Sequence, residues 1–190
     1  WMYETLIAQF DFPVLKTEAQ LQAEREKAGS NVIPYYKLDG KVAARGSSAV
    51  STLDLGEWSD VKVTLSDALT ALYAKGILAP SVEQNIEELI HDAGGIIYVQ
   101  KDRRAEKVPV SEIYTVEAAA SYLRDAIAAD FPECDVDSLY VAASLGSLVV
   151  PDLMYDQQTT DLIHEESVNY VSATQGVVRA GQVIVSEGEM

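Results

Sequence analysis

The sequence predicts an α+β fold in which about five helices pack on a small mixed sheet, closed by a glycine-rich β unit at the C-terminus. Apolar residues recur at helical spacing in residues 65–73 and again in residues 116–127. Short β-branched runs such as residues 96–100 are typical of strands. These two periodicities predict helices and strands within one fold.

The first part of the chain is predicted to hold two extended segments with a helix between them. Pro13 cannot lie inside a helix and favours an extended conformation at the residue before it. A capping box at residues 17–20 then begins a largely polar helix over about residues 18–28. Pro34-Tyr35-Tyr36 follows as an extended segment. Residues 39–63 match no pattern, and their glycines predict irregular connections.

The middle of the chain is predicted to alternate helices with one interior strand. An apolar stripe begins at Leu65 and ends at Gly76, and a second capping box at residues 80–84 begins another helix. Residues 96–100 are apolar enough for an interior strand, and residues 107–113 are expected to be extended. Further helices are expected over residues 116–129, 135–145 and 157–167.

The last stretch, residues 168–190, is predicted to form a small β unit. Its two β-branched runs, residues 177–178 and 183–185, are typical of strands. Glycine adopts positive φ without steric cost and is therefore favoured at tight reversals. The glycines that we expect at turns are Gly176, Gly181 and Gly188.

The composition limits the classes of function. The 190 residues are 48% apolar, which suffices for a core in one domain or in two small lobes. With 30 acidic and 14 basic residues the net charge is −16, which argues against nucleic acid as a partner and against docking flat on anionic lipid. The lone Cys134 excludes an internal disulfide and a cysteine-based metal cluster. No apolar run reaches the ~18 residues of a membrane-spanning helix.

Three segments together resemble one known family. They are residues 172–189 (SATQGVVRAGQVIVSEGE), the Phe-Asp-Phe-Pro of residues 10–13 with the later Pro34-Tyr35-Tyr36, and residues 151–156 (PDLMYD). In this order they resemble the extracellular domain of the seven-transmembrane HD-hydrolase family, a group of bacterial membrane proteins. Asp152 departs from the Asn that is more usual in that pattern.

The resemblance implies a location and a function. Residues 1–190 would be a single extracytoplasmic domain on the outer face of the bacterial inner membrane, with residues 168–190 as a membrane-proximal β unit. The domain would be a non-catalytic sensor of a small ligand or an envelope protein, and it could form a homodimer. Membrane helices outside the chain would join it to an HD phosphohydrolase that hydrolyses cyclic di-AMP in the cytoplasm. Trp1 and Met190 should then lie on the same side of the domain.

Two groups of polar residues are candidates for chemistry. His91-Asp92 is like the metal-binding dipeptide of HD phosphohydrolases, but His164 is the only other histidine, which leaves too few ligands for a two-metal site. We therefore predict a structural role for His91-Asp92 and no catalytic residue, metal or cofactor in this chain. The second group is acidic and is predicted to be a solvated surface. Its members are Asp152, Asp156, Asp161, Glu165 and Glu166.

A ligand site is predicted where aromatic and polar residues occur in the segments that carry the resemblance. Aromatic rings with a few polar groups are typical of concave binding sites. The predicted ligand-binding residues are Tyr35, Tyr36, Tyr155 and Asp156. Two other functions stay open on the sequence alone: a structural module that mediates dimerisation, and a stand-alone acidic hydrolase with two convergent carboxylates. The hydrolase would use Asp152, Asp156 and Glu165.

Overall fold

A computed structural model describes residues 5–79, 95–101 and 103–185. The chain divides into two compact units, Trp1–Val32 with Asp161–Met190 (unit 1) and Ile33–Thr160 (unit 2). The described residues contain α-helices and a mixed sheet, which confirms the predicted α+β class.

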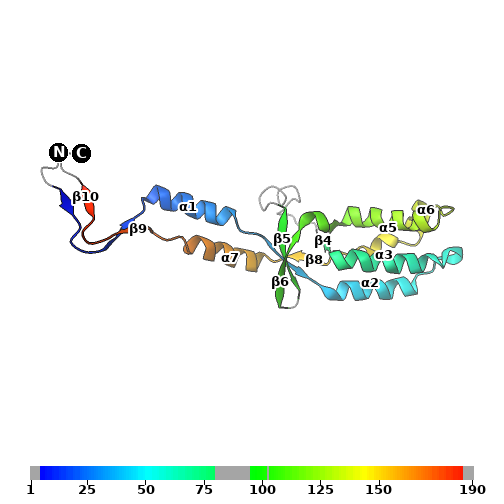
Figure 1. Ribbon diagram of the computed structural model, residues 1–190. Helices are drawn as coiled ribbons and strands as arrows, with labels where there is room; N and C mark the ends of the chain where they lie inside the picture. The colour runs from blue at the N-terminus through cyan, green and yellow to red at the C-terminus, as the bar shows by residue number, and fades with distance from the viewer. Residues whose placement is uncertain (1–4, 80–94, 102, 186–190) are drawn as a thin grey trace. The chain divides into compact units, whose positions relative to one another are not determined.

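Unit 2 contains a six-stranded mixed sheet (Figure 1). Its strands are β3 (Tyr35–Leu38), β4 (Ile77–Leu78), β5 (Ile96–Lys101), β6 (Arg104–Pro109), β7 (Tyr114–Thr115) and β8 (Leu153–Tyr155). They lie in the order β6-β5-β3-β8-β4-β7. β3 is parallel to β5 and antiparallel to β8, while β4 is parallel to both β8 and β7. The predicted strand at 96–100 is confirmed. The extended segment expected at 107–113 is correct only up to Pro109, where the antiparallel partner β6 ends, because a 3-10 turn (Val110–Glu112) follows.

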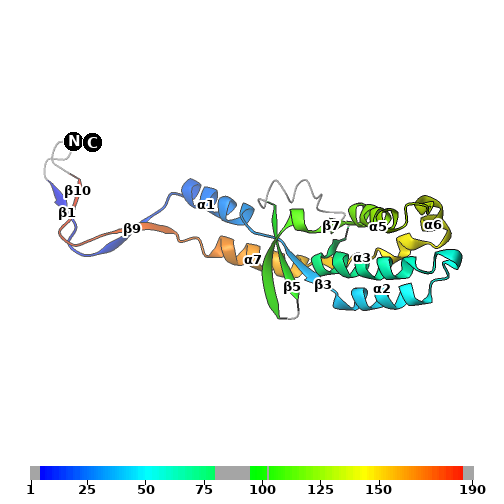
Figure 2. The same cartoon turned by 45° about the vertical axis from the view of Figure 1, so that its right-hand side comes forward.

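Helices α2 (Gly40–Thr52), α3 (Val61–Lys75) and α5 (Val116–Asp130) of unit 2 lie side by side in both ribbon views (Figures 1 and 2). The shorter α6 (Val136–Ala142) follows α5. The predicted apolar stripe of α3 is confirmed, because its members pack against α5 with almost no exposed surface. The fully buried residues of this core include Val61, Leu65, Leu69, Leu72, Leu123 and Ile127. Each buried side chain of this size contributes on the order of 1.5–3 kcal/mol to folding.

A second core cluster covers one face of the sheet. Its buried members are Tyr36, Leu78, Ile97, Val110 and Leu153. Gly76 connects α3 to β4 with φ +93°, and a Cβ at this position would lie 2.6 Å from Leu153 Cδ1. Only glycine fits both the backbone angle and this close contact.

Unit 1 consists of helix α1 (Glu18–Ser30), most of α7 (Gln157–Asn169) and four short strands. The capping box predicted for α1 is present, since the Thr17 hydroxyl accepts the Gln20 N–H and the Gln20 side chain accepts the Thr17 N–H. The strands are β1 (Leu6–Ile7), β2 (Phe12–Leu15), β9 (Thr174–Val178) and β10 (Val183–Val185).

The C-terminal β unit is built differently from the tight reversals that the glycines predict. β9 pairs antiparallel with β2, and β10 pairs antiparallel with β1, so each C-terminal strand has an N-terminal partner. Gly181 does occupy a turn with φ +88°, as predicted. Gly176 does not, because it lies inside β9 opposite Val14, while Gly188 lies outside the described residues.

The described ends of the chain lie beside each other, since Leu6 is paired with Val185. Trp1 and Met190 themselves lie outside the described residues. The helix predicted after residue 80 and the His91-Asp92 dipeptide lie outside them as well.

The prediction of irregular structure at residues 39–63 was wrong for its first half, which is helix α2. The Asp39 carboxylate accepts the Lys41 N–H and caps this helix. Gly46 is buried in it, and a Cβ there would lie 3.1 Å from the Tyr73 ring of α3. The glycine that looked like a chain break therefore allows the close packing of α2 on α3.

Candidate functional site

The four predicted ligand-binding residues come together on two neighbouring strands of unit 2. β3 and β8 run antiparallel, with Tyr36 opposite Tyr155 and with the Asp156 N–H donated to the Tyr35 carbonyl at 2.8 Å. Successive side chains of a strand point to opposite faces of the sheet. The four residues therefore form two pairs, Tyr36 with Tyr155 on one face and Tyr35 with Asp156 on the other.

The Tyr36–Tyr155 pair belongs to the core. Tyr36 is 1% exposed, and its ring centroid lies 5.5 Å from that of Tyr155. Burial, and to a lesser degree the neighbouring Tyr155 hydroxyl, raises the pKa of Tyr36 to about 12. The geometry is that of an aromatic packing pair, with ring separation in the range that favours such contacts.

Tyr35 lies on the opposite face, in an aromatic stack. Its ring is stacked on Tyr98 of β5, with centroids 4.6 Å apart and planes inclined by 17°. The Lys107 ammonium lies 5.5 Å from the centroid of the Tyr98 ring, on the neighbouring strand β6. Burial, followed by the nearby Tyr98, raises the pKa of Tyr35. This face thus offers two half-buried rings with a cation beside them.

Asp156 shares the face of Tyr35 and is 6% exposed. The Lys37 ammonium lies 2.8 Å from its carboxylate, and Thr159 donates to it through both its hydroxyl and its N–H. Burial alone would raise the pKa of Asp156, but the bonds from Lys37 and Thr159 outweigh it and hold the pKa below its ordinary value. Asp156 is therefore a charged carboxylate at neutral pH that already has two partners, Lys37 and Thr159.

A separate cavity of about 420 Å³ opens on the core-side face of the β3–β5–β6 part of the sheet. Half-buried apolar side chains of Leu38, Val99 and Val108 form part of its lining. Five charged side chains line it as well: Lys75, Lys101, Arg104, Glu106 and Glu112. None of the four predicted residues lines this cavity.

Two of the cavity's cations have no ion-pair partner among the described residues. Lys101 and Arg104 face each other at the end of the β5–β6 hairpin, yet neither forms a salt bridge there. Unpaired cations are unexpected in a chain with twice as many acidic as basic residues. They give the cavity a local excess of positive charge, which suits a ligand that carries an anionic group.

Comparison with known proteins identifies the family. A family model described as "7TM-HD extracellular" matches residues 46–190. The chain belongs to this family. No curated protein and no solved structure matches the chain. The match includes the PDLMYD and C-terminal segments on which the resemblance rested, whereas the Phe-Asp-Phe-Pro segment precedes it.

Two of the three carboxylates that a hydrolase would need have structural partners in this 7TM-HD extracellular domain. Asp152 is 2% exposed, and its carboxylate accepts the buried Ile77 N–H at 2.6 Å. Asp156 is paired with Lys37, and Glu165 is an exposed residue of unit 1. Among residues 5–79, 95–101 and 103–185 there is no cluster of three or more acidic, histidine or cysteine side chains arranged to hold a metal ion.

Sequence reasoning missed the cavity of the 7TM-HD extracellular domain because its lining is dispersed along the chain. In the sequence, residues 101–104 look like a charged turn, and the structure has a turn at Arg103, with Arg104 as the first residue of strand β6. The density of cations in residues 101–107 of an acidic chain was the signal that could have drawn attention to it.

Among residues 5–79, 95–101 and 103–185, no helix has the length and apolarity needed to cross a membrane.

Proposed function

We propose that this chain is the non-catalytic sensor domain of a membrane-bound HD phosphohydrolase that hydrolyses cyclic di-AMP in the cytoplasm. The observation that carries the proposal is the family match over residues 46–190. The catalytic metals and the cyclic dinucleotide would then lie in another domain of the parent protein. Nucleic acid is not expected as a partner, because the chain carries a net charge of −16.

The strand pairing of unit 1 supports a mechanical role. β1 pairs with β10 and β2 pairs with β9, so the N-terminal and C-terminal segments are held together by backbone hydrogen bonds. A displacement of either segment is therefore transmitted to the other. Two paired segments of this kind suit a domain that is joined to membrane helices at both ends, and residues 168–190 would be the membrane-proximal part.

The ligand, a small molecule or an envelope protein, has two candidate surfaces in unit 2. The first is the face with Tyr35, its stacking partner Tyr98, and Asp156. Tyr36 and Tyr155 would support this surface from the core side without direct contact. The second is the cavity lined by Lys101 and Arg104, which form no salt bridge with another described residue.

Two matched variants separate these surfaces. Tyr35→Ala removes a ring from the first surface, and Arg104→Ala removes a cation from the second. The affinity for a ligand found by screening envelope extracts should fall at least about tenfold in one variant and stay within about twofold in the other. If both variants bind as the wild type does, neither surface is the ligand site.

A catalytic role can be tested on the chain itself. The purified chain, supplied with Mn²⁺ and cyclic di-AMP, should release no product, while the full-length parent should. Turnover by the isolated chain that survives repurification and is lost in His91→Ala would overturn the proposal. If the domain only mediates dimerisation, the rate of hydrolysis by the parent should depend on the protein concentration and should not change when a compound is added.

A further inference from the structure

The four short strands of unit 1 leave most of their large apolar side chains exposed. We call residues 5–16 and 170–185, which contain β1, β2, β9 and β10, the apolar tip. Phe10 is 69% exposed and Leu15 is 67% exposed. Eight of the thirteen exposed large apolar side chains in the described part of the chain belong to this tip. They are Leu6, Ile7, Phe10, Leu15, Tyr170, Val177, Val183 and Ile184.

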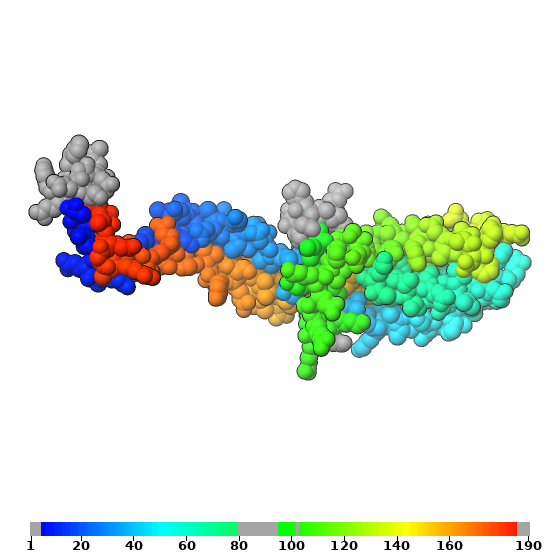
Figure 3. Space-filling view, in the orientation of Figure 1, coloured from blue at the N-terminus to red at the C-terminus, as the bar shows by residue number. Residues whose placement is uncertain are grey.

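The exposure follows from the way in which the strands pair. β1–β10 and β2–β9 are separate two-stranded sheets, so each has two faces and no third strand. Figure 3 shows these strands, in blue and red, with no helix over the face in view. Of the tip's residues, all of which the structure describes, only Ala8 is buried. Two-stranded sheets are marginally stable in water, and a surface that exposes many large apolar side chains is typical of an interaction site.

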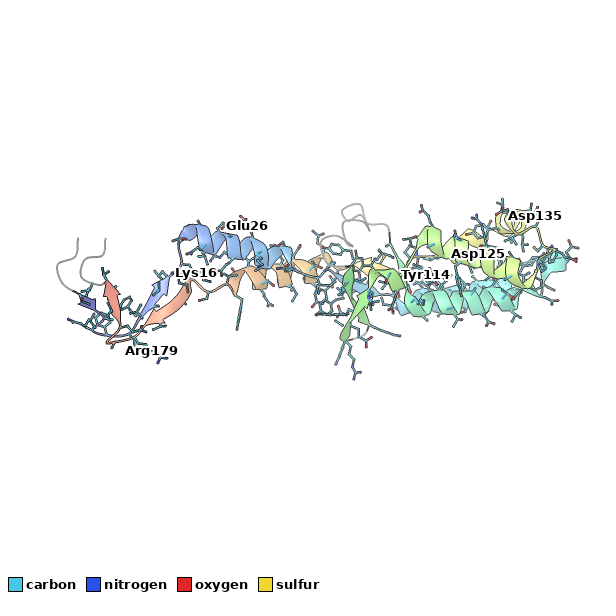
Figure 4. The ribbon with its side chains drawn as sticks, turned by 45° about the horizontal axis from the view of Figure 1, so that its top comes forward. Lys16, Glu26, Tyr114, Asp125, Asp135 and Arg179 are labelled. Carbon is cyan, nitrogen blue, oxygen red and sulfur yellow. The ribbon has the colours of Figure 1, made fainter. Side chains whose placement is uncertain are left out.

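The tip is also nearly free of negative charge, unlike the rest of the chain. It contains one carboxylate, Asp11, and two cations, Lys16 and Arg179, so its net charge is +1 in a chain of −16. Asp11 accepts the Ala180 N–H at 2.7 Å, and Lys16 pairs with Glu24. Lys16 and Arg179 lie at opposite ends of the β2–β9 pair (Figure 4).

We propose that the apolar tip docks directly on a lipid bilayer, with its apolar side chains between the headgroups and the acyl chains. A surface that combines aliphatic side chains, exposed aromatic rings and isolated cations is typical of the membrane interface. Phe10 and Tyr170 supply the rings, and Arg179 supplies a cation without an ion-pair partner among the described residues. A protein surface is the less suitable occupant, because the tip lacks the complementary charges that give protein interfaces their specificity.

This inference refines what the composition predicts about lipid. A net charge of −16 disfavours contact along the whole chain, whereas residues 5–16 and 170–185 carry +1. Glu4, Glu187 and Glu189 flank the tip in the sequence, so the binding is expected to depend on apolar contact and not on charge. The inference rests on membership of a family of extracellular domains of membrane proteins, and not on the proposed sensing of a ligand. It fails or holds independently of whether a ligand is found.

Flotation of the purified chain with vesicles tests the proposal. Phosphatidylcholine vesicles should carry the chain to the top of a density gradient, and 0.5 M salt should not release it, because apolar contact is not screened. The double variant Phe10→Ser with Ile184→Ser should lower the vesicle partition coefficient on the order of tenfold. Val63→Ser with Val141→Ser is the matched control, since these residues of unit 2 are 68% and 75% exposed. The control should float like the wild type.

Three outcomes would overturn the proposal. The first is a wild-type chain that stays at the bottom of the gradient. The second is binding that only anionic vesicles support and that salt abolishes, since this would be electrostatic attraction without insertion. The third is a chain that sediments as a dimer without vesicles and becomes a monomer in the Phe10→Ser, Ile184→Ser variant, because a second copy would then cover the tip. Circular dichroism of each variant checks that the fold is retained. Arg179→Ala removes a cation of the tip and changes no apolar side chain, so this second variant separates the contribution of charge from that of apolar contact.

Discussion

Replacement of Asp152 by Ala and by Asn separates two roles of one buried carboxylate. Its Oδ1 accepts the Ile77 N–H at 2.6 Å, and both residues are almost fully buried. Asp152→Ala leaves the Ile77 N–H without a partner in the core, which costs about 1–3 kcal/mol of unfolding free energy. For a chain of 190 residues, a loss of this size should lower the midpoint of thermal unfolding by about 2–12 °C.

Asp152→Asn keeps an acceptor for the same N–H and removes the buried charge. Burial raises the pKa of Asp152, the N–H groups of Ile77 and of Asp152 itself oppose this rise, and the charge of Asp39 adds to it. Because the pKa of Asp152 is raised in the folded state, protonation of its carboxyl group stabilises the folded wild type. This stabilisation is complete below the ordinary pKa of about 3.8 and is lost as the pH rises through the pKa of the folded state. Asn is uncharged throughout, so this variant should be at least as stable as the wild type at pH 7.

The assay is thermal unfolding followed by circular dichroism between pH 3 and pH 8 for the three proteins. The expected order of midpoints at pH 7 is Asn at or above the wild type, with Ala clearly lowest. The reasoning is refuted if Asn loses as much as Ala, because the negative charge itself would then be what the fold requires. It is also refuted if Ala costs nothing, because the Ile77 bond would then be dispensable.

Three further predictions concern the two units separately. Gly76→Ala should lower the unfolding free energy by roughly 3 kcal/mol, since the new methyl group meets the buried Leu153 at a strained backbone angle; a loss below about 1 kcal/mol in urea unfolding would contradict this. Lys37→Met should lower the unfolding free energy at pH 7 by only about 1 kcal/mol, because the half-exposed lysine is screened by water. This loss should disappear in acid as the pH falls through the lowered pKa of Asp156, and a loss that is the same at every pH would refute the ion pair. Gly181→Val should cost about 1–2 kcal/mol through its backbone alone and should speed hydrogen exchange in residues 174–185 but not in residues 61–75, while uncoupling the domain from its parent; equal loss in both segments would count against a local effect.

The sequence was most informative where local spacing decides the structure. The stripe that includes Leu65 and Leu69 predicted α3, and the Thr17 capping box predicted the start of α1, because both signals lie within a few residues. Helix α2 was missed because Gly46 is explained only by the Tyr73 ring, which lies on another helix. Local patterns also cannot show that β9 and β10 pair with N-terminal strands, since the partners are more than 150 residues away.

The candidate site shows the same division. The sequence brought Tyr35, Tyr36 and Tyr155 to attention, and the structure places them on adjacent strands. Strand alternation could have shown that Tyr35 and Tyr36 point to opposite faces, so that one surface cannot hold both rings. The cations of residues 101–107 could have drawn attention to the cavity, but its lining could not have been predicted, because Leu38, Val99 and Lys75 come from three separate elements that only the tertiary fold brings together.

The central claim is that this domain regulates hydrolysis without performing it. The most direct test is the rate of cyclic di-AMP hydrolysis by the full-length parent in sealed vesicles, compared with a parent in which a short Gly-Ser linker replaces residues 33–160, and with the isolated chain. We expect product from both membrane proteins at different rates, and none from the isolated chain. Hydrolysis by the isolated chain, or identical rates for the two membrane proteins in the presence and absence of envelope extract, would contradict it.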